Sequence, residues 1–178
     1  MIDWSQVWTE ATKQGAAAVE FAVAAALVAF FVDAVRRRRA RRSMLQAVLL
    51  ELLNNRDYAA AVPGIAQRIQ ASFPAGATPT LKSWTRGDTQ DSAFARAWAS
   101  DDTRVMKRRA LAASLRNAYS GIAVFKETEA EVVRLLDRDD GEQAFHVLVS
   151  LANQAPALVA TIQGAINVLD AEGIRLPG

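Results

Sequence analysis

The sequence predicts an all-α protein, with one N-terminal transmembrane helix followed by a small antiparallel helical bundle. Three observations support this prediction: an apolar run over residues 16–32, an arginine run directly behind it, and apolar residues spaced three and four apart along much of the remaining chain. No alternation of apolar and polar residues predicts a strand. The pattern therefore favours one membrane-crossing helix joined to a helical domain.

The predicted membrane-spanning segment is rich in alanine and nearly free of charge. Residues 16–32 read AAAVEFAVAAALVAFFV, and Glu20 is the one charged side chain among them. At a rise of about 1.5 Å per residue this run covers roughly 25 Å. Extension to residues 16–35 admits Asp33 and reaches the roughly 20 residues that a span needs. We therefore predict a transmembrane helix over residues 16–35.

The flanks of this segment predict its orientation. Trp4 and Trp8 precede it, where their rings suit the headgroup region, and six arginines follow it at once. Arginines beside a span stay in the cytoplasm, because moving them across the bilayer is costly. A cleavable secretory signal has the reverse charge order. The arginines are Arg36, Arg37, Arg38, Arg39, Arg41 and Arg42.

This charge order divides the chain into four parts. Residues 1–15 are expected to be a short extracytoplasmic segment and residues 16–35 the span. Residues 36–43 form a basic juxtamembrane stop, and residues 44–178 form a cytoplasmic helical-bundle domain. The expected location is the cell inner membrane or an equivalent membrane, crossed once.

The arginine run admits three interpretations. It can set topology alone, it can also bind anionic lipid headgroups, or it can contact nucleic acid. Without these six arginines, 15 basic residues stand against 19 acidic ones. A nucleic-acid binder usually spreads basic charge over a face of its folded domain. Membrane lipids are therefore the expected partner, and nucleic acid is not.

A soluble alternative competes with the span. An alanine-rich helix buried in a bundle and followed by a solvated basic turn has the same composition, since alanine is nearly neutral toward the bilayer. The agreement of both flanks favours the membrane. An interfacial helix is disfavoured, because the apolar run lacks the polar face that such a helix needs.

Small residues form a stripe along the predicted span, within roughly 80° on a helical wheel. Such stripes let helices approach closely in lipid, so a second copy or another membrane protein is an expected partner, although an alanine-rich run also yields a stripe by chance. Glu20 lies on the opposite side, about a turn inside the outer end. An intramembrane carboxylate is a candidate functional group, but here the interface is within its reach. The stripe consists of Gly15, Ala18, Ala22, Ala25 and Ala29.

The first part of the cytoplasmic domain is predicted to be helical over residues 43–62. No breaker separates this helix from the span, so the chain can run as one helix through the arginines to Ala61. Pro63 and Gly64 predict a break, residues 65–73 a short helix, and residues 74–80 a loop. Asn54 and Asn55 interrupt the apolar stripe, and either a buried asparagine that fixes register or an exposed pair fits.

The middle and end of the domain carry further helices. Residues 93–99 and 103–137 are predicted to be helical, the second with a cap at Asp101 or Asp102. Burial of Trp84 and Trp98 is favoured over contact with a partner. In the long helix only Glu129 breaks a series of apolar residues with heptad-like spacing. The series is Leu111, Leu115, Ala118, Ile122, Phe125, Val132 and Leu136.

The last predicted helix begins at Asp140, an N-cap candidate with Gln143 three residues on. Pro156 should kink this helix or start a new one, and Gly173 suits its end. Its apolar residues are expected to face the core. They are Phe145, Leu148, Leu151, Leu158, Ile162, Ile166 and Leu169.

The sequence carries no motif that predicts catalysis. There is no cysteine, which excludes disulfides and thiolate chemistry, and His146 is the one histidine. No phosphate-binding glycine motif and no calcium loop occurs. We therefore expect neither an enzyme nor a cofactor or metal site, and a polar helix position for His146.

These observations lead to two functional hypotheses. The first is a non-enzymatic, membrane-anchored interaction protein, such as an accessory subunit or scaffold of a membrane complex. The second is a membrane-active effector that oligomerises through its transmembrane helix, in the manner of a holin or toxin. The small-residue stripe and Glu20 motivate the second hypothesis.

Overall fold

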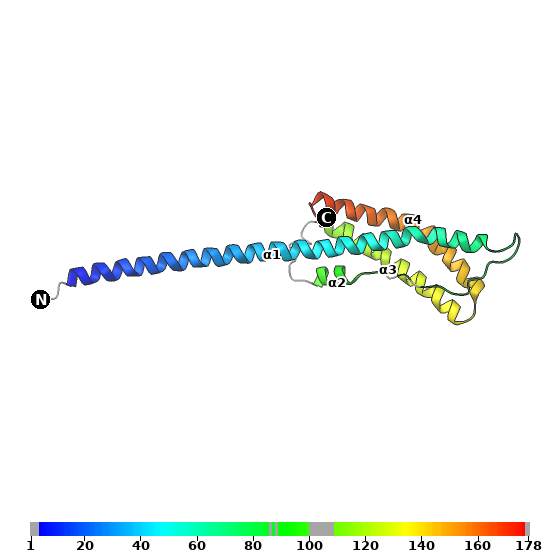
Figure 1. Cartoon of the computed structure of the whole chain (residues 1–178), viewed down its shortest axis with the longest axis horizontal. Helices are drawn as coiled ribbons and strands as arrows, with labels where there is room; N and C mark the ends of the chain where they lie inside the picture. Colours follow the sequence, from blue (N-terminus) through cyan, green and yellow to red (C-terminus); the bar gives the residue numbers. More distant parts are fainter. Residues whose placement is uncertain (1–3, 86, 88, 100–108, 177–178) are drawn as a thin grey trace. The chain divides into compact units, whose positions relative to one another are not determined.

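The protein is all-α, as the sequence predicts. A computed structural model describes residues 4–85, 87, 89–99 and 109–176, and their side chains from residue 23 onward. It contains α1 (Trp4–Ala71), α2 (Ser92–Ala99), α3 (Arg109–Asp137) and α4 (Gly141–Ala171), and these described residues form no strand (Figure 1). The contacts divide the chain into two compact units, Met1–Arg42 and Ser43–Gly178.

Helix α1 runs without interruption for 68 residues. The predicted break at Pro63 and Gly64 is wrong, and the short helix predicted over residues 65–73 is the last part of α1. A proline inside a helix loses one hydrogen bond and costs about 3 kcal/mol. Val62 and Ala66, on either side of the proline, are buried in the core, so packing holds the helix together through this point.

The second unit has one hydrophobic core. Helices α3 and α4 pack against each other, and the part of α1 from Leu45 to Ala66 contributes to the same core. In Figure 1 this part of α1 runs alongside them. The fully buried large side chains include Leu52, Phe125 and Leu148, one from each helix. Each such side chain stabilises the fold by about 1.5–3 kcal/mol relative to an exposed position.

The predicted core face of α3 is confirmed for six of its seven apolar positions, which are buried. The exception is Leu136, which is only partly buried while Leu135 is buried. Leu136 lies about seven turns beyond Leu111 and therefore on the same side of α3, so the buried side turns toward Leu135 only in the last turn of the helix. The predicted start of the helix, residues 103–108, and its cap lie outside the described residues.

Both ends of α4 agree with the sequence. Asp140 is the N-cap, and its carboxylate accepts a hydrogen bond from the Gln143 backbone N–H at 3.1 Å. Gly173 follows the helix with φ +72°, a conformation that glycine adopts at little cost. Pro156 lies inside α4, so the expectation that it begins a new helix is wrong.

Helix α4 is also the helix that passes a membrane-span criterion of length and composition. Among the described residues only Gly141–Ala171 passes, with mean hydropathy 1.4, rather than the N-terminal segment that we predicted. One third of its apolar 18-residue stretch is buried, and α4 supplies ten buried residues to the core. A core helix needs such apolarity, which accounts for the result. The side chains of residues 16–22, part of the predicted span, lie outside the described residues.

Candidate functional site

The described part of the predicted span exposes its apolar side chains. Residues 23–34 are all exposed, and in the remainder of α1 the first buried side chain is Leu45. Soluble proteins rarely expose contiguous apolar surface of this extent. Six of the ten large exposed hydrophobic residues of the described chain lie in this short stretch: Val23, Leu27, Val28, Phe30, Phe31 and Val32.

The arginine run continues α1 as regular helix. At 100° per residue its six arginines surround the helix, and no arc wider than about 100° lacks one. All of them are exposed except the half-buried Arg41, and Arg37 forms an ion pair with Asp33 one turn earlier. Asp33, the charge at the inner end of the predicted span, is therefore paired with one of these arginines.

Several predicted site residues belong to the part of α1 whose side chains are not described. Trp4, Trp8 and Glu20 lie outside the described side chains, as do three residues of the small-residue stripe, Gly15, Ala18 and Ala22. The other two stripe residues, Ala25 and Ala29, are exposed.

A buried carboxylate, Glu129, forms the centre of a polar cluster in the second unit. Its side chain is 0% exposed, and its Oε1 accepts hydrogen bonds from the Gly87 backbone N–H at 2.8 Å and the Trp84 indole Nε1–H at 3.2 Å. The Tyr58 hydroxyl of α1 donates to the same oxygen. Glu129 therefore joins α1 and α3 to the irregular segment between α1 and α2.

Two further polar side chains of α1 hold the same irregular segment. Asn55 donates to the Gln90 carbonyl at 2.7 Å and accepts from the Gln90 N–H at 2.9 Å. Glu51 accepts from the Ala93 N–H at 2.7 Å, in the first turn of α2. With Tyr58, these residues lie at spacings of four and three, on one face of the helix. Asn55 is thus the buried asparagine, and Asn54 is exposed.

The sequence could place Glu129 on the core face but not assign its partners. The spacing marks it as the charged residue in an apolar series, which is the signal for a buried carboxylate. Its three donors come from residues 58, 84 and 87, and no local pattern brings these together. Trp84 is half-buried against the core, in line with the prediction, whereas Trp98 is 44% exposed, so its predicted burial is wrong.

Burial also shifts the pKa values of Glu51 and Tyr119, two titratable groups next to α2. It raises the pKa of Glu51 above its ordinary value, against the opposing effect of the Ala93 hydrogen bond. Burial and the neighbouring Glu51 charge raise the pKa of the Tyr119 hydroxyl. The Tyr119 hydroxyl and the Glu51 Oε1 are both buried and interact electrostatically, but neither makes a well-formed hydrogen bond within the described residues.

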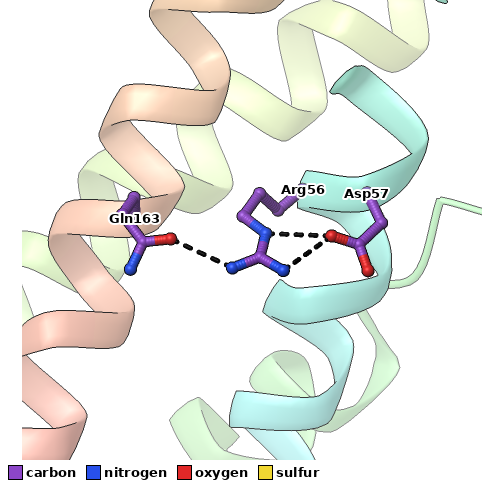
Figure 2. Close-up of polar contacts among 3 residues, drawn as sticks. All are labelled: Arg56, Asp57 and Gln163. Carbon is purple, nitrogen blue, oxygen red and sulfur yellow. Dashed lines mark hydrogen bonds and ion pairs between the residues drawn. The ribbon is translucent and has the colours of Figure 1, made fainter. Parts of the chain in front are cut away.

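A partly exposed polar contact links α1 to α4 (Figure 2). The Arg56 guanidinium donates to Asp57 at 2.7 and 2.9 Å and to the Gln163 amide oxygen of α4 at 3.0 Å. Such contacts contribute roughly 0–1 kcal/mol when they are open to solvent. This triad therefore orients two helices and indicates no chemistry.

The described residues show no metal-binding group. No cluster of three histidine or acidic side chains occurs among them, and His146 is exposed on α4. The position of His146 fits a polar helix residue.

No known protein family, no curated protein and no solved structure matches this chain.

Proposed function

We propose that this chain is a single-pass membrane protein whose helical bundle is anchored at the cytoplasmic face by α1. The span is residues 16–35, and the bundle is the unit Ser43–Gly178. The bundle acts without chemistry of its own, as an accessory subunit or scaffold that binds another membrane protein or a second copy.

The observation that carries this proposal is the exposed apolar stretch over residues 23–32, followed after three residues by arginines around the whole helix. Water penalises such a stretch by about 25 cal/mol for each Å² of apolar surface, and a bilayer removes that cost. A helix lying on a membrane needs its basic residues on one face. Arginines on every side instead suit a helix whose axis crosses the interface.

The interaction role rests on the composition of the span. Five small residues, Gly15, Ala18, Ala22, Ala25 and Ala29, lie within roughly 80° on the wheel with no bulky residue among them, and this side permits close approach of another helix. In lipid, packing between helices of this kind is a main source of association. A partner that also crosses the membrane is therefore the expected ligand of the span.

The test places charge on the exposed apolar stretch. The double variant Leu27→Arg, Phe31→Arg introduces two charges, each costing about 2.5–3.5 kcal/mol at the centre of a span. We expect the unaltered chain to stay in the membrane pellet after alkaline carbonate extraction and the double variant to appear in the supernatant. Leu50→Arg is the matched control, since Leu50 is a 48% exposed apolar residue of α1 beyond the arginines.

The control variant should remain in the pellet. Release of the unaltered chain by carbonate, or equal retention of the double variant, would refute membrane insertion through residues 16–35.

A further inference from the structure

An open pocket of about 450 Å³ lies between α2 and α3. This volume falls within the range of small-molecule sites, which is roughly 300–1,000 Å³. Tyr119 and Ile122 of α3 are buried at its base together with the half-buried Phe94 of α2. Phe94 and Tyr119 stack with ring centroids 3.9 Å apart and planes within 9° of parallel. The pocket lining therefore includes two stacked aromatic rings.

Trp98 extends this aromatic lining outward. Its ring lies 5.6 Å from that of Phe94, and it is 44% exposed although the sequence favours its burial. A large exposed aromatic side chain at a pocket mouth offers apolar contact area with little loss of conformational entropy. The lining thus suits a planar, apolar group.

The charges at the pocket favour an anion. The Arg116 guanidinium lies 5.1 Å above the Trp98 ring and makes no ion pair or hydrogen bond among the described residues. A guanidinium packed on a ring still offers N–H donors in its own plane. The one acid of the lining, Asp91, is paired with Lys126 at 3.1 Å. Within the described part of the chain, Arg116 is therefore the cation of the lining that has no acidic partner.

We propose that this pocket binds a small aromatic carboxylate, with its ring against Phe94 and Trp98 and its carboxylate on Arg116. The volume limits the occupant to a small molecule, and the arginine selects its charge. This activity goes beyond the anchoring role, and the pocket lies wholly within the unit Ser43–Gly178, so it does not depend on membrane insertion.

The test compares two probes that differ mainly in charge. Naphthylacetate and naphthylacetamide have the same ring and nearly the same shape. Isothermal titration calorimetry would use the full chain in phosphatidylcholine nanodiscs, with empty nanodiscs as the blank for partition into lipid. We expect saturable binding of both probes and a preference of about tenfold for the carboxylate, as expected for a charge-assisted hydrogen bond.

Two variants then test whether Arg116 and Trp98 form the binding site. Arg116→Gln should abolish the preference for the carboxylate, and Trp98→Ala should weaken the binding of both probes. Arg134→Gln is the matched control, because it removes an exposed arginine of α3 that does not line the pocket. Absence of saturable binding, equal affinity for the two probes, or an unchanged preference in Arg116→Gln would each overturn the proposal.

Discussion

At the residue scale, Glu129 combines complete burial with three donors on a single oxygen. A buried carboxylate is costly unless its charge is compensated by hydrogen bonds. Here the donors are the Tyr58 hydroxyl of α1 and, from the segment between α1 and α2, the Trp84 indole and the Gly87 N–H. The packing also explains why position 87 is a glycine, because a Cβ there would overlap the Tyr58 ring. The cluster thus fixes a segment that has no secondary structure of its own.

Replacing Glu129 by alanine should therefore be severely destabilising. The substitution removes the shared acceptor of three part-buried donors, of which only the Gly87 N–H keeps another, the Tyr58 hydroxyl at 3.1 Å. At about 1–3 kcal/mol for each of the other two donors, we expect a loss of at least about 2 kcal/mol, which corresponds to a Tm roughly 5 °C lower. Thermal unfolding of the full chain in detergent micelles, followed by far-UV circular dichroism, measures this. Glu127→Ala, at an exposed position of α3, should stay within about 0.5 kcal/mol of the parent. Similar Tm values for the two variants would contradict this account.

Glu51 gives the fold a dependence on pH with a defined sign. Because burial raises the pKa of Glu51 above 4.5, the folded protein keeps a proton that the unfolded chain has lost. The stabilising contribution is complete below about pH 4.5 and is lost as the pH rises through the folded pKa. Glu51→Gln removes this titration and keeps an oxygen for the Ala93 N–H.

The measurement compares unfolding curves from pH 4 to pH 7. The stability of the parent relative to Glu51→Gln should decrease as the pH rises, and Glu127→Gln is the control. Parallel stability profiles for the parent and Glu51→Gln would show that the Glu51 carboxyl does not titrate differently in the folded state.

At the element scale, local patterns predict helices well and their interruptions poorly. The apolar spacing identifies the core faces of α3 and α4, and the caps at Asp140 and Gly173 follow from single residues. Pro63 and Pro156 also look decisive locally, yet both lie inside continuous helices. The packing of α1 and α4 into the core outweighs the one hydrogen bond that each proline removes.

The polar cluster and the pocket show a different limit of sequence reasoning. Glu51, Asn55 and Tyr58 share one face of α1, which a helical wheel reveals, but their partners lie in the irregular segment before α2. The exposure of Trp98 likewise depends on how α2 sits on α3. Such contacts join residues that are far apart in the chain, so only the tertiary fold specifies them.

At the scale of the whole molecule, the arginine run carries the prediction of topology. The chain has no cysteine, so Ser5→Cys and Ser43→Cys each introduce a single thiol, one on either side of the predicted span. In intact cells a membrane-impermeant maleimide should label Ser5→Cys, and it should label Ser43→Cys only after permeabilisation. Labelling of Ser43→Cys in intact cells would reverse the proposed orientation.

Neutralising the arginines should then randomise this orientation. The variant changes Arg36, Arg38, Arg39 and Arg42 to glutamine. It retains Arg37, which pairs with Asp33, and the half-buried Arg41. Because retention of positive charge in the cytoplasm sets the direction of insertion, each cysteine reporter should become partly labelled in intact cells. The control changes two exposed arginines of the second unit, Arg134 and Arg138, to glutamine and should leave labelling unchanged, since charges far from a span have little influence on its direction. If the arginine-depleted chain keeps a single orientation, then the apolar stretch, and not the charge behind it, determines how α1 enters the membrane.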